Sequence, residues 1–428
     1  MRIHVVQPGD TITGISNEYG VPVNRIVSDN GLLDPGRLVV GQALIILIPE
    51  TTYTVAPGDT LISVSERFGI SPLTLVQNNL ELAVDPQLKV GQVLTIKFEG
   101  TKRRTIAING YAYPFINRNV LLRSLPLLTR LTIFGYGFNL NGELTTIDDQ
   151  PLINLAYQFR TAPVMLLSAI DENDVFNSYL ASVLFQTPAL QDKVLDNVIS
   201  VMTTKGYLGL DIDFEFIPPE DREGFIAFVQ KAASRLNPLG YFVNTDLAPK
   251  TSADQAGLLY ESHDYAAIGA ASNTVLLMTY EWGYTYGPPM AVAPLNRVRE
   301  VVEYAVTEIP VERIFMGIPN YGYVWPLPFE QGITQATTIG NEYAVSLARQ
   351  NGVSIQFDEL GQSPWFEYTE QTERRVVWFE DVRSIQAKFN LIDEFSLFGG
   401  AYWNLMRPFN QNWAFLSAVY DILKTVNP

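Results

Sequence analysis

From Thr105 onward, apolar runs of strand length alternate with longer stretches of mixed character. Two of the intervening stretches, 221–236 and 294–308, carry apolar residues at helical spacing. Strands that alternate with helices in this way predict a (β/α)8 TIM barrel of the α/β class. A doubly wound sheet would show the same alternation, but no glycine-rich phosphate-binding turn follows the first run, so the barrel is favoured. The eight runs are residues 105–113, 130–138, 162–170, 206–216, 241–249, 274–282, 314–323 and 397–405.

The first hundred residues contain an internal repeat. The stretch "VVQPGDTITGISNEYGVPVNRIVSDN" at 5–30 recurs as "TVAPGDTLISVSERFGISPLTLVQNN" at 54–79. In each copy a short β run leads into Pro-Gly-Asp-Thr, two helices follow, and Val-Gly-Gln opens a closing strand, which predicts a small βααβ module. The expected units are module one at 1–49, module two at 50–99, a polar and basic linker at 100–104, and the barrel domain at 105–428 with a small α+β insertion at about 326–380.

The Asp-Thr pair in each copy stands where a helix N-cap belongs. Asp10 and Asp59 can therefore be interpreted as helix caps with a purely structural role. Gly20 and Gly69 stand where each first helix is expected to end in a left-handed C-cap.

The fourth run contains "GLDIDFEF", residues 209–216, with three acids at alternate positions among large apolar residues. Alternate residues of a strand share one face. Asp211, Asp213 and Glu215 are thus expected to point into the barrel and rise toward its C-terminal mouth, where barrel active sites lie. So many neighbouring carboxyl groups cannot all ionise at low cost, and Glu215 at the mouth is the natural general acid. The expected outward-facing residues are Leu210, Ile212, Phe214 and Phe216.

The same three acids are also compatible with metal binding or with a solvated strand face. A calcium loop would need glycine at its sixth position, where Phe216 stands, but an Asp–Glu magnesium site fits the pattern. The acids could instead form the solvated face of an edge strand, although the bulky apolar alternation argues against that.

Composition removes several classes of function. The net charge of −16 argues against nucleic acid or an anionic membrane as the main partner. The chain has no Cys, which excludes a thiolate nucleophile and a Cys-based zinc site, and His4 and His263 cannot build a three-His metal centre. No metal or cofactor is expected. The start, "MRIHVVQPGD", lacks the features of a secretory signal, and no apolar run has the length of a membrane span.

Both copies of the repeat resemble LysM modules through "PGDT", Asn30 or Asn79, and "VGQ". This resemblance implies binding of glycans that contain N-acetylglucosamine, such as chitin or peptidoglycan. The expected contacts are Gly9, Asp10 and Thr11 in module one and Gly58, Asp59 and Thr60 in module two.

The acidic stretch resembles the fourth-strand signature of family 18 glycoside hydrolases, Asp-x-x-Asp-x-Asp-x-Glu. Asp211, Asp213 and Glu215 match its last three acids, while Leu208 stands at the first. The segments "LMTYEWGY" and "GGAYWNL" resemble the sixth and eighth strands of that family. The resemblance spans 105–428 and includes the insertion before the last strand.

This resemblance implies a retaining, substrate-assisted glycosidase. Glu215 would protonate the glycosidic oxygen while the N-acetyl carbonyl of the −1 sugar attacks the anomeric carbon. Asp213 would orient the acetamido N–H, Tyr280 would hold its carbonyl, and Trp403 would form the floor of the −1 subsite. The alternative, that Tyr280 and Trp403 are core aromatic residues of the barrel, is less favoured. Further expected substrate contacts are Glu281, where the family usually has Asp, Asn320 and Tyr321 at the end of the seventh run, and Tyr111 after the first.

Paired LysM modules together with "LAPKTS" and "TYEWGYTYGPPMAVAP" resemble more specifically the spore-cortex-lytic group of family 18. That implies an N-acetylglucosaminidase of cortical peptidoglycan, associated with the spore, made without a cleavable signal peptide, active in germination and monomeric. A chitinase and a non-catalytic glycan-binding protein on the same scaffold remain open, although the retained Glu215 argues against the second. The missing Cys excludes a Cys–His cell-wall peptidase.

Overall fold

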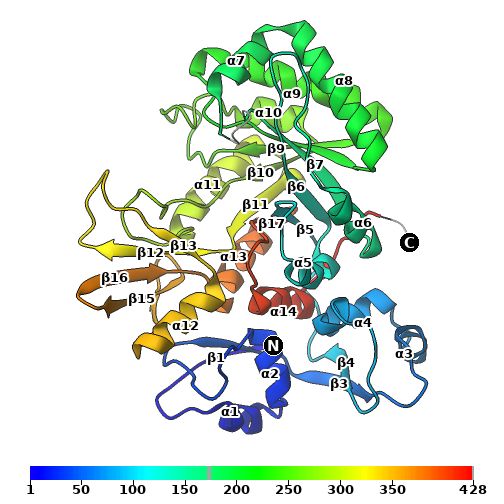
Figure 1. The fold of residues 1–428 in the computed structure, drawn as a ribbon, viewed down its shortest axis with the longest axis vertical. Helices are drawn as coiled ribbons and strands as arrows, with labels where there is room; N and C mark the ends of the chain where they lie inside the picture. The colour runs from blue at the N-terminus through cyan, green and yellow to red at the C-terminus, as the bar shows by residue number, and fades with distance from the viewer. Residues whose placement is uncertain (171–174, 427–428) are drawn as a thin grey trace.

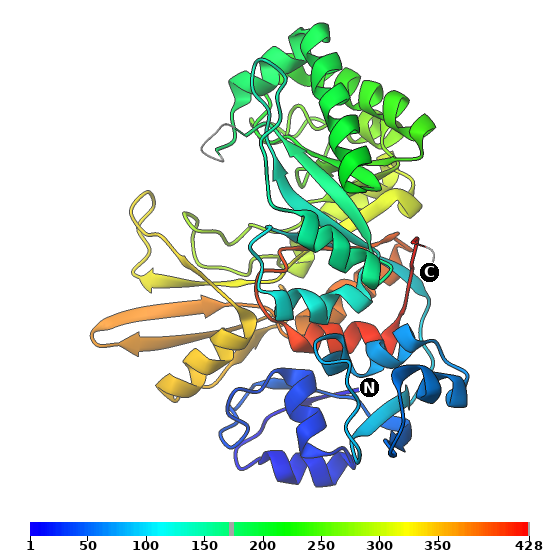
Figure 2. The same cartoon turned by 45° about the vertical axis from the view of Figure 1, so that its right-hand side comes forward.

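The structure is a computed structural model that describes residues 1–170 and 175–426. Two small modules lie side by side beneath a parallel barrel, and a separate antiparallel sheet projects from the barrel's flank (Figures 1 and 2). In module one β1 (Arg2–Val5) pairs with β2 (Ala43–Ile46) around α1 (Ile12–Tyr19) and α2 (Val23–Asn30). In module two β3 (Pro49–Thr54) pairs with β4 (Val93–Phe98) around α3 (Leu61–Phe68) and α4 (Pro72–Asn78). The predicted βααβ modules are confirmed.

The helix caps fall on the threonines of the repeat and not on its aspartates. The Thr11 and Thr60 side chains accept hydrogen bonds from the third residue of α1 and α3, and Gly20 and Gly69 end these helices in the left-handed conformation. The interpretation of the two aspartates as helix caps is wrong. Asp10 instead accepts from the Gln7 backbone N–H at 2.6 Å and Asp59 from that of Ala56 at 2.7 Å, so each carboxylate closes its own Pro-Gly turn.

The asparagine at the end of each second helix closes its module. The Asn30 amide donates to Ile26 O and Ile45 O and accepts from the Ile45 backbone N–H. Asn79 makes the equivalent three bonds to Leu75 and Thr95. Because both amides are buried and fully used, they join helix to strand at the centre of each module.

The barrel is closed by parallel pairing between its first and last strands. The described residues form eight parallel barrel strands in sequence order, which confirms the predicted fold class. The strands are β5 (Thr105–Ala112), β6 (Arg130–Tyr136), β7 (Ala162–Ser168), β8 (Gly209–Asp213), β9 (Phe242–Leu247), β10 (Thr274–Leu277), β11 (Ile314–Pro319) and β17 (Gly399–Trp403), and short β18 (Asp421–Ile422) pairs with β5. The outer helices are α5 (Arg118–Ser124), α6 (Gln150–Gln158), α7 (Ser178–Gln186), α8 (Pro188–Lys205), α9 (Arg222–Leu236), α10 (Tyr265–Ala271), α11 (Leu295–Glu308), α13 (Val382–Glu394) and α14 (Asn410–Val419).

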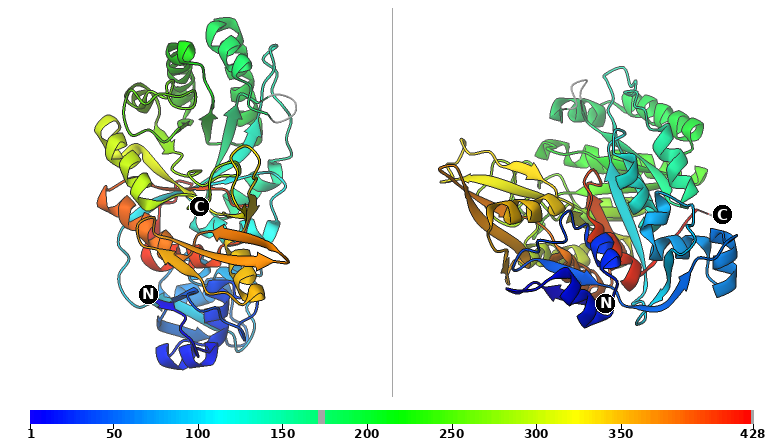
Figure 3. Two further views of the ribbon diagram at one scale, coloured as in Figure 1. Left: turned by 90° about the vertical axis from the view of Figure 1, so that its left-hand side faces the viewer. Right: turned by 60° about the horizontal axis from the view of Figure 1, so that its bottom comes forward.

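The sheet between β11 and β17 begins at Gly322, inside the seventh apolar run and ahead of the expected boundary near 326. Its order is β13-β12-β16-β15-β14, with α12 packed beside it. Figure 3 shows this sheet standing away from the barrel. Its elements are β12 (Gly322–Leu327), β13 (Thr337–Ile339), α12 (Asn341–Asn351), β14 (Gln356–Asp358), β15 (Ser363–Glu370) and β16 (Glu373–Trp378).

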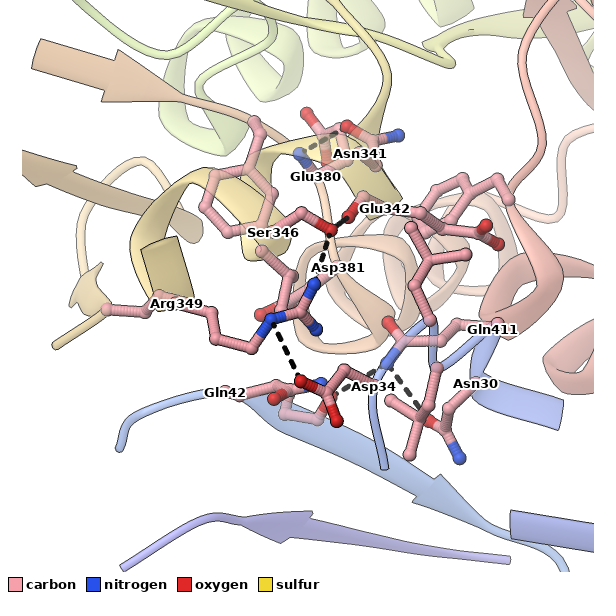
Figure 4. Close-up of a pocket in the computed structure, with 18 of the residues that line it drawn as sticks. Asn30, Asp34, Gln42, Asn341, Glu342, Ser346, Arg349, Glu380, Asp381 and Gln411 are labelled. Atoms are coloured by element: carbon pink, nitrogen blue, oxygen red, sulfur yellow. Dashed lines mark hydrogen bonds and ion pairs between the residues drawn. The ribbon is translucent and has the colours of Figure 1, made fainter. Parts of the chain in front are cut away.

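Module one is bonded directly to the barrel domain. Gln411 on α14 donates to Asn30 Oδ1 at 3.0 Å and to Ala43 O at 2.7 Å (Figure 4). On α12, Glu342 accepts from the Asn410 backbone N–H at 2.9 Å and lies so close to Gly31 that a Cβ there would come within 2.2 Å of its carboxylate. A side chain at Gly31 would have to displace the Glu342 carboxylate and adopt a positive φ of 58°, so this contact favours glycine.

The expected linker is also held in place. Arg103 and Arg104 both form ion pairs with Asp393 on α13, at 2.9 Å each. Module two is bonded to the barrel through Ser417, whose hydroxyl donates to Gln77 O at 2.7 Å. None of the helices in the described ranges combines the length and apolar character that a bilayer crossing requires.

Candidate active site

A cavity of about 320 Å³ opens at the C-terminal ends of the barrel strands. Five of the predicted site residues line it: Asp213, Glu215, Tyr280, Glu281 and Trp403. The other predicted barrel residues, Asp211, Tyr111, Asn320 and Tyr321, do not line it and are buried. Further lining residues include Tyr113, Phe134, Phe176, Asp246, Pro249, Tyr260, Met278 and Trp282.

Strand β8 places its acids as the alternation predicts. Leu210, Ile212 and Phe214 are fully buried in the shell between barrel and helices, and the Phe214 ring lies 5.6 Å from that of Phe228. Phe216 is an exception, because it has positive φ (55°) and its side chain is 42% exposed. The expectation that Phe216 packs against the helices is wrong. The strand ends at Asp213, and the chain turns immediately after Glu215.

Asp213 and Glu215 have raised proton affinity. Burial raises the pKa of Asp213 well above its ordinary value, and the charges of Glu215 and Asp211 add to the rise. Its Oδ1 atom is buried without a hydrogen-bond partner in the described part of the chain. Burial also raises the pKa of Glu215 to about 7, with a contribution from the charge of Glu281. A carboxyl that exchanges its proton near neutral pH can serve as both acid and base.

Glu281 follows Tyr280 in a left-handed backbone conformation, with φ of 66°. Its carboxylate accepts hydrogen bonds from the Tyr321 hydroxyl and, at 3.1 and 3.2 Å, from the Tyr323 hydroxyl. Burial raises the pKa of Glu281, while the two phenols oppose that rise. Tyr321 thus lies behind the pocket and holds one of its lining residues.

Tyr111 and Asn320 also bond to protein atoms. The Tyr111 hydroxyl lies 2.7 Å from Asp211 Oδ2, beneath the pocket. The Asn320 amide donates to Asn404 O and Arg407 O, at 2.9 Å each, and so ties the end of β11 to the loop after β17. In this structure, therefore, neither side chain lies where the substrate contact expected of it would be made.

Trp403 stands at the end of β17 within a group of aromatic rings. Its ring centroid lies 5.6 Å from that of Phe134 and 6.1 Å from that of Tyr113, both of which also line the cavity. An aromatic wall of this kind provides the apolar face on which a sugar ring can pack.

Asp246, on β9, was not among the predicted residues. Asp211 pairs in register with Asn244 and Ile212 with Thr245, so Asp246 stands level with Asp213 on the neighbouring strand. It is 3% exposed and lines the cavity. The signal was present in the sequence, since "NTDLAP" also places an acid at the C-terminal end of an apolar run.

The predicted glycan-binding turns lie on the surfaces of the two modules. Gly9 and Gly58 are exposed with φ of 91° and 88°, and none of the six turn residues lines the barrel cavity. In the described ranges, no cluster of at least three His, Asp or Glu side chains is arranged to hold a metal ion.

Comparisons with known proteins agree with this architecture. The model of the glycosyl hydrolases family 18 matches residues 116–407, and that of the LysM domain matches 4–47 and 53–97. The chain is 39% identical to the cortical fragment-lytic enzyme of Bacillus subtilis (strain 168) over 99% of both sequences. The crystal structure of the Bacillus cereus spore cortex-lytic enzyme SleL matches with a TM-score of 0.85 at 37% identity, covering 100% of this chain and 99% of that one. A Chromobacterium violaceum chitinase, at 22% identity and a TM-score of 0.68, shares the fold. The chain therefore belongs to the glycosyl hydrolases of family 18 and is a glycosidase with two LysM domains ahead of its (β/α)8 barrel.

Proposed function

We propose that this glycosidase hydrolyses N-acetylglucosamine linkages of spore-cortex peptidoglycan by a retaining, substrate-assisted mechanism. The observation that supports this mechanism is the burial of the Asp213 carboxyl group in the cavity wall. A carboxyl group must be ionised to act as a nucleophile, and burial beside Glu215 and Asp211 holds the Asp213 pKa well above its ordinary value. Burial therefore disfavours Asp213 as a nucleophile, and the N-acetyl carbonyl of the −1 sugar is suited to take that role.

Five residues of the cavity have distinct roles in this proposal. Glu215 donates its proton to the glycosidic oxygen and then, as a carboxylate, activates the water that opens the oxazolinium intermediate. Asp213 accepts a hydrogen bond from the acetamido N–H, and Tyr280 holds the acetamido carbonyl, since both residues line the cavity. Trp403 supports the −1 sugar ring, while Glu281, held by two tyrosines, faces the same sugar.

The substrate class rests on two relatives. Full-length similarity to the cortical fragment-lytic enzyme and to the spore cortex-lytic enzyme SleL supports cortex peptidoglycan as substrate, with a place on the spore and a role in germination. The LysM domains at 1–49 and 50–99 would hold the glycan through their Pro-Gly-Asp-Thr turns. The protein would act as a monomer, since a single chain supplies the whole cavity.

Digestion of purified walls tests the proposal. Spore-cortex and vegetative peptidoglycan are incubated with the wild type and with Glu215→Gln, and the new reducing ends are identified by mass spectrometry. Glu220→Gln serves as a matched control, because Glu220 is an exposed acid on the following turn. New N-acetylglucosamine reducing ends from cortex, present with the wild type and Glu220→Gln and absent with Glu215→Gln, are expected.

Two outcomes would contradict the proposal. Cleavage of chitin oligomers with both walls left intact would identify a chitinase. Tight binding without cleavage of any of these polymers would leave a glycan-binding protein. The anomeric configuration of the first product, followed by proton NMR, tests retention separately.

A further inference from the structure

Asp246 is a buried carboxyl group in the cavity wall to which the proposed mechanism assigns no role. The titratable groups that face it are Tyr111 from β5, Asp211 and Asp213 from β8, and Tyr280 from the segment after β10. No ion pair in the described part of the chain includes it. Burying an ionised carboxylate without a partner costs free energy, so Asp246 must be either hydrogen-bonded or protonated.

A directional chain of hydrogen bonds determines which atoms face the two deep acids. Arg130, buried at the lower end of the barrel, donates from Nη1 to Thr274 Oγ1 at 2.7 Å. Because arginine only donates, the Thr274 proton is directed to Asn244 Oδ1 at 2.8 Å. Asn244 then presents its NH2 group upward, and it donates to Asp211 Oδ1 at 2.7 Å and to Asp246 Oδ1 at 3.0 Å.

The contacts of the Tyr111 hydroxyl bear on how many protons Asp211 and Asp246 hold between them. Its oxygen lies 2.7 Å from Asp211 Oδ2 and 2.9 Å from Asp246 Oδ1. One hydroxyl has one proton to donate, so it can satisfy only one carboxylate. Both short contacts can be full hydrogen bonds when one of the two carboxyl groups is itself protonated and donates to the phenol oxygen.

Asp246 is the member of the pair that holds the proton. Burial raises the pKa of Asp211 as well, but its hydrogen bonds from Asn244 and Tyr111 and the positive charge of Arg130 oppose that rise. Thr132 donates a weaker bond to Asp211, at 3.4 Å. Burial raises the pKa of Asp246 well above its ordinary value, and the charges of Asp211 and Asp213 raise it further. Burial lowers the pKa of Arg130 to about 10, so Arg130 is still a cation at neutral pH.

We infer that Asp246 is a positioning residue of the active site, whose protonated carboxyl holds Tyr111 and Asp211 in place beneath Asp213 in the cavity wall. This inference rests on the role proposed for Asp213. An ionised Asp246 would place a negative charge level with Asp213 and leave the Tyr111 oxygen facing two carboxylates. When Asp246 is neutral, Asp211 carries the negative charge of the group formed by Asp211, Asp246 and Tyr111, and Arg130 balances it.

Two substitutions in the full chain separate shape from charge. Asp246→Asn has the size and neutrality of a protonated carboxyl, whereas Asp246→Ala removes the group. At pH 6 we expect Asp246→Asn to keep kcat within about threefold of the wild type, and Asp246→Ala to lose roughly 10- to 100-fold through misplacement of Asp213. KM should change little in either. Equal loss of kcat in both variants, or no loss in either, would overturn the inference.

Infrared difference spectroscopy tests the proton directly and needs no substrate. Subtracting the spectrum of Asp246→Asn from that of the wild type at pH 6 should show the loss of a protonated-carboxyl C=O band, and loss of a carboxylate band would overturn the inference. If Asp246→Ala does not fold, Tyr111→Phe takes its place in the kinetic comparison, because it breaks the same bridge. A wild type that cleaves no wall or chitin polymer would refute the proposed function, while the infrared result would still locate the proton.

Discussion

Two sets of buried carboxyl groups in the barrel domain are held in opposite ways. Glu380, 1% exposed, meets the fully buried ammonium of Lys388, whose Nζ lies 3.0 and 2.8 Å from its two carboxylate oxygens. In the cavity, Asp213 and Asp246 are buried to nearly the same degree and Glu215 is partly buried. No ion pair in the described residues includes any of these three acids. The first arrangement neutralises a charge inside the protein. The second arrangement favours the protonated form of carboxyl groups at the site of the reaction.

The difference shows which buried acids stabilise the fold and which perform the reaction. Burial raises the pKa of Glu380, but the charge and hydrogen bonds of Lys388 oppose that rise and favour the anion. Unpaired carboxyl groups in a cavity remain protonated well above their ordinary range, and this is the state that a general acid requires. Substitutions in the two sets should therefore have opposite effects on stability and on activity.

Glu215→Gln should give the largest effect on activity. Removal of the exchangeable proton is expected to lower kcat by roughly 10²- to 10⁴-fold, the usual range for general acid–base catalysis. The free energy of unfolding at pH 7 should be unchanged or higher, because an amide of the same shape replaces a partly buried acid. Rates on cortex peptidoglycan and urea denaturation of the same samples measure both. A lower free energy of unfolding for Glu215→Gln would show that this acid stabilises the fold as well, which contradicts the contrast with Glu380.

Lys388→Met should give the largest effect on stability. It leaves Glu380 buried without a partner, which is expected to lower the free energy of unfolding by about 3–5 kcal/mol. The double variant Glu380→Gln/Lys388→Met should recover most of that loss, because the uncompensated charge is gone. Urea denaturation at pH 7 measures both variants. The kcat of the folded fraction should match the wild type, and a catalytic defect in the double variant would contradict the separation of roles.

The sequence predicted the features that depend on local pattern. Asp213 and Glu215 were found because a two-residue period among apolar residues fixes the face on which each side chain lies. The caps at Thr11 and Thr60 follow from the same kind of short-range rule, although it did not distinguish the threonine from the aspartate beside it.

The depth of a side chain beneath the cavity could not be predicted in the same way. Tyr111, Asn320 and Tyr321 stand at strand ends as expected, but their polar atoms are taken up by Asp211, by Asn404 and Arg407, and by Glu281. These partners come from distant parts of the chain, so no local pattern reveals them. Asp246 was missed because a single acid forms no alternation, although its place at a strand end was visible.

Glu281→Gln sharpens the comparison within the cavity itself. Glu215 acts while protonated, so activity falls as pH rises through its pKa of about 7. Burial is the main cause of that value, and the charge of Glu281 contributes the rest. Without this charge, the alkaline limb of the kcat/KM profile should move to lower pH. Profiles of the wild type and the variant between pH 4 and 9 measure the shift, and Glu220→Gln should leave the limb in place. An unmoved limb would show that burial alone sets the proton affinity.

The smallest effect expected is on how stability depends on pH. The Glu215 pKa is about 7 in the folded chain against 4.5 for an exposed glutamate, so between these values the unfolded chain releases the proton while the folded chain keeps it. The contribution of Glu215 is therefore fully present below pH 4.5 and is lost as pH rises through about 7. Glu215→Gln removes this dependence, so its free energy of unfolding relative to the wild type should increase between pH 5 and pH 8. The increase should be only on the order of 1 kcal/mol, because Glu215 is partly exposed to solvent and its charge is screened there. Urea denaturation at the two pH values measures it, with Glu220→Gln as the flat reference. A difference of the opposite sign would mean that Glu215 is stabilised as an anion, and the contrast with Glu380 would then no longer hold.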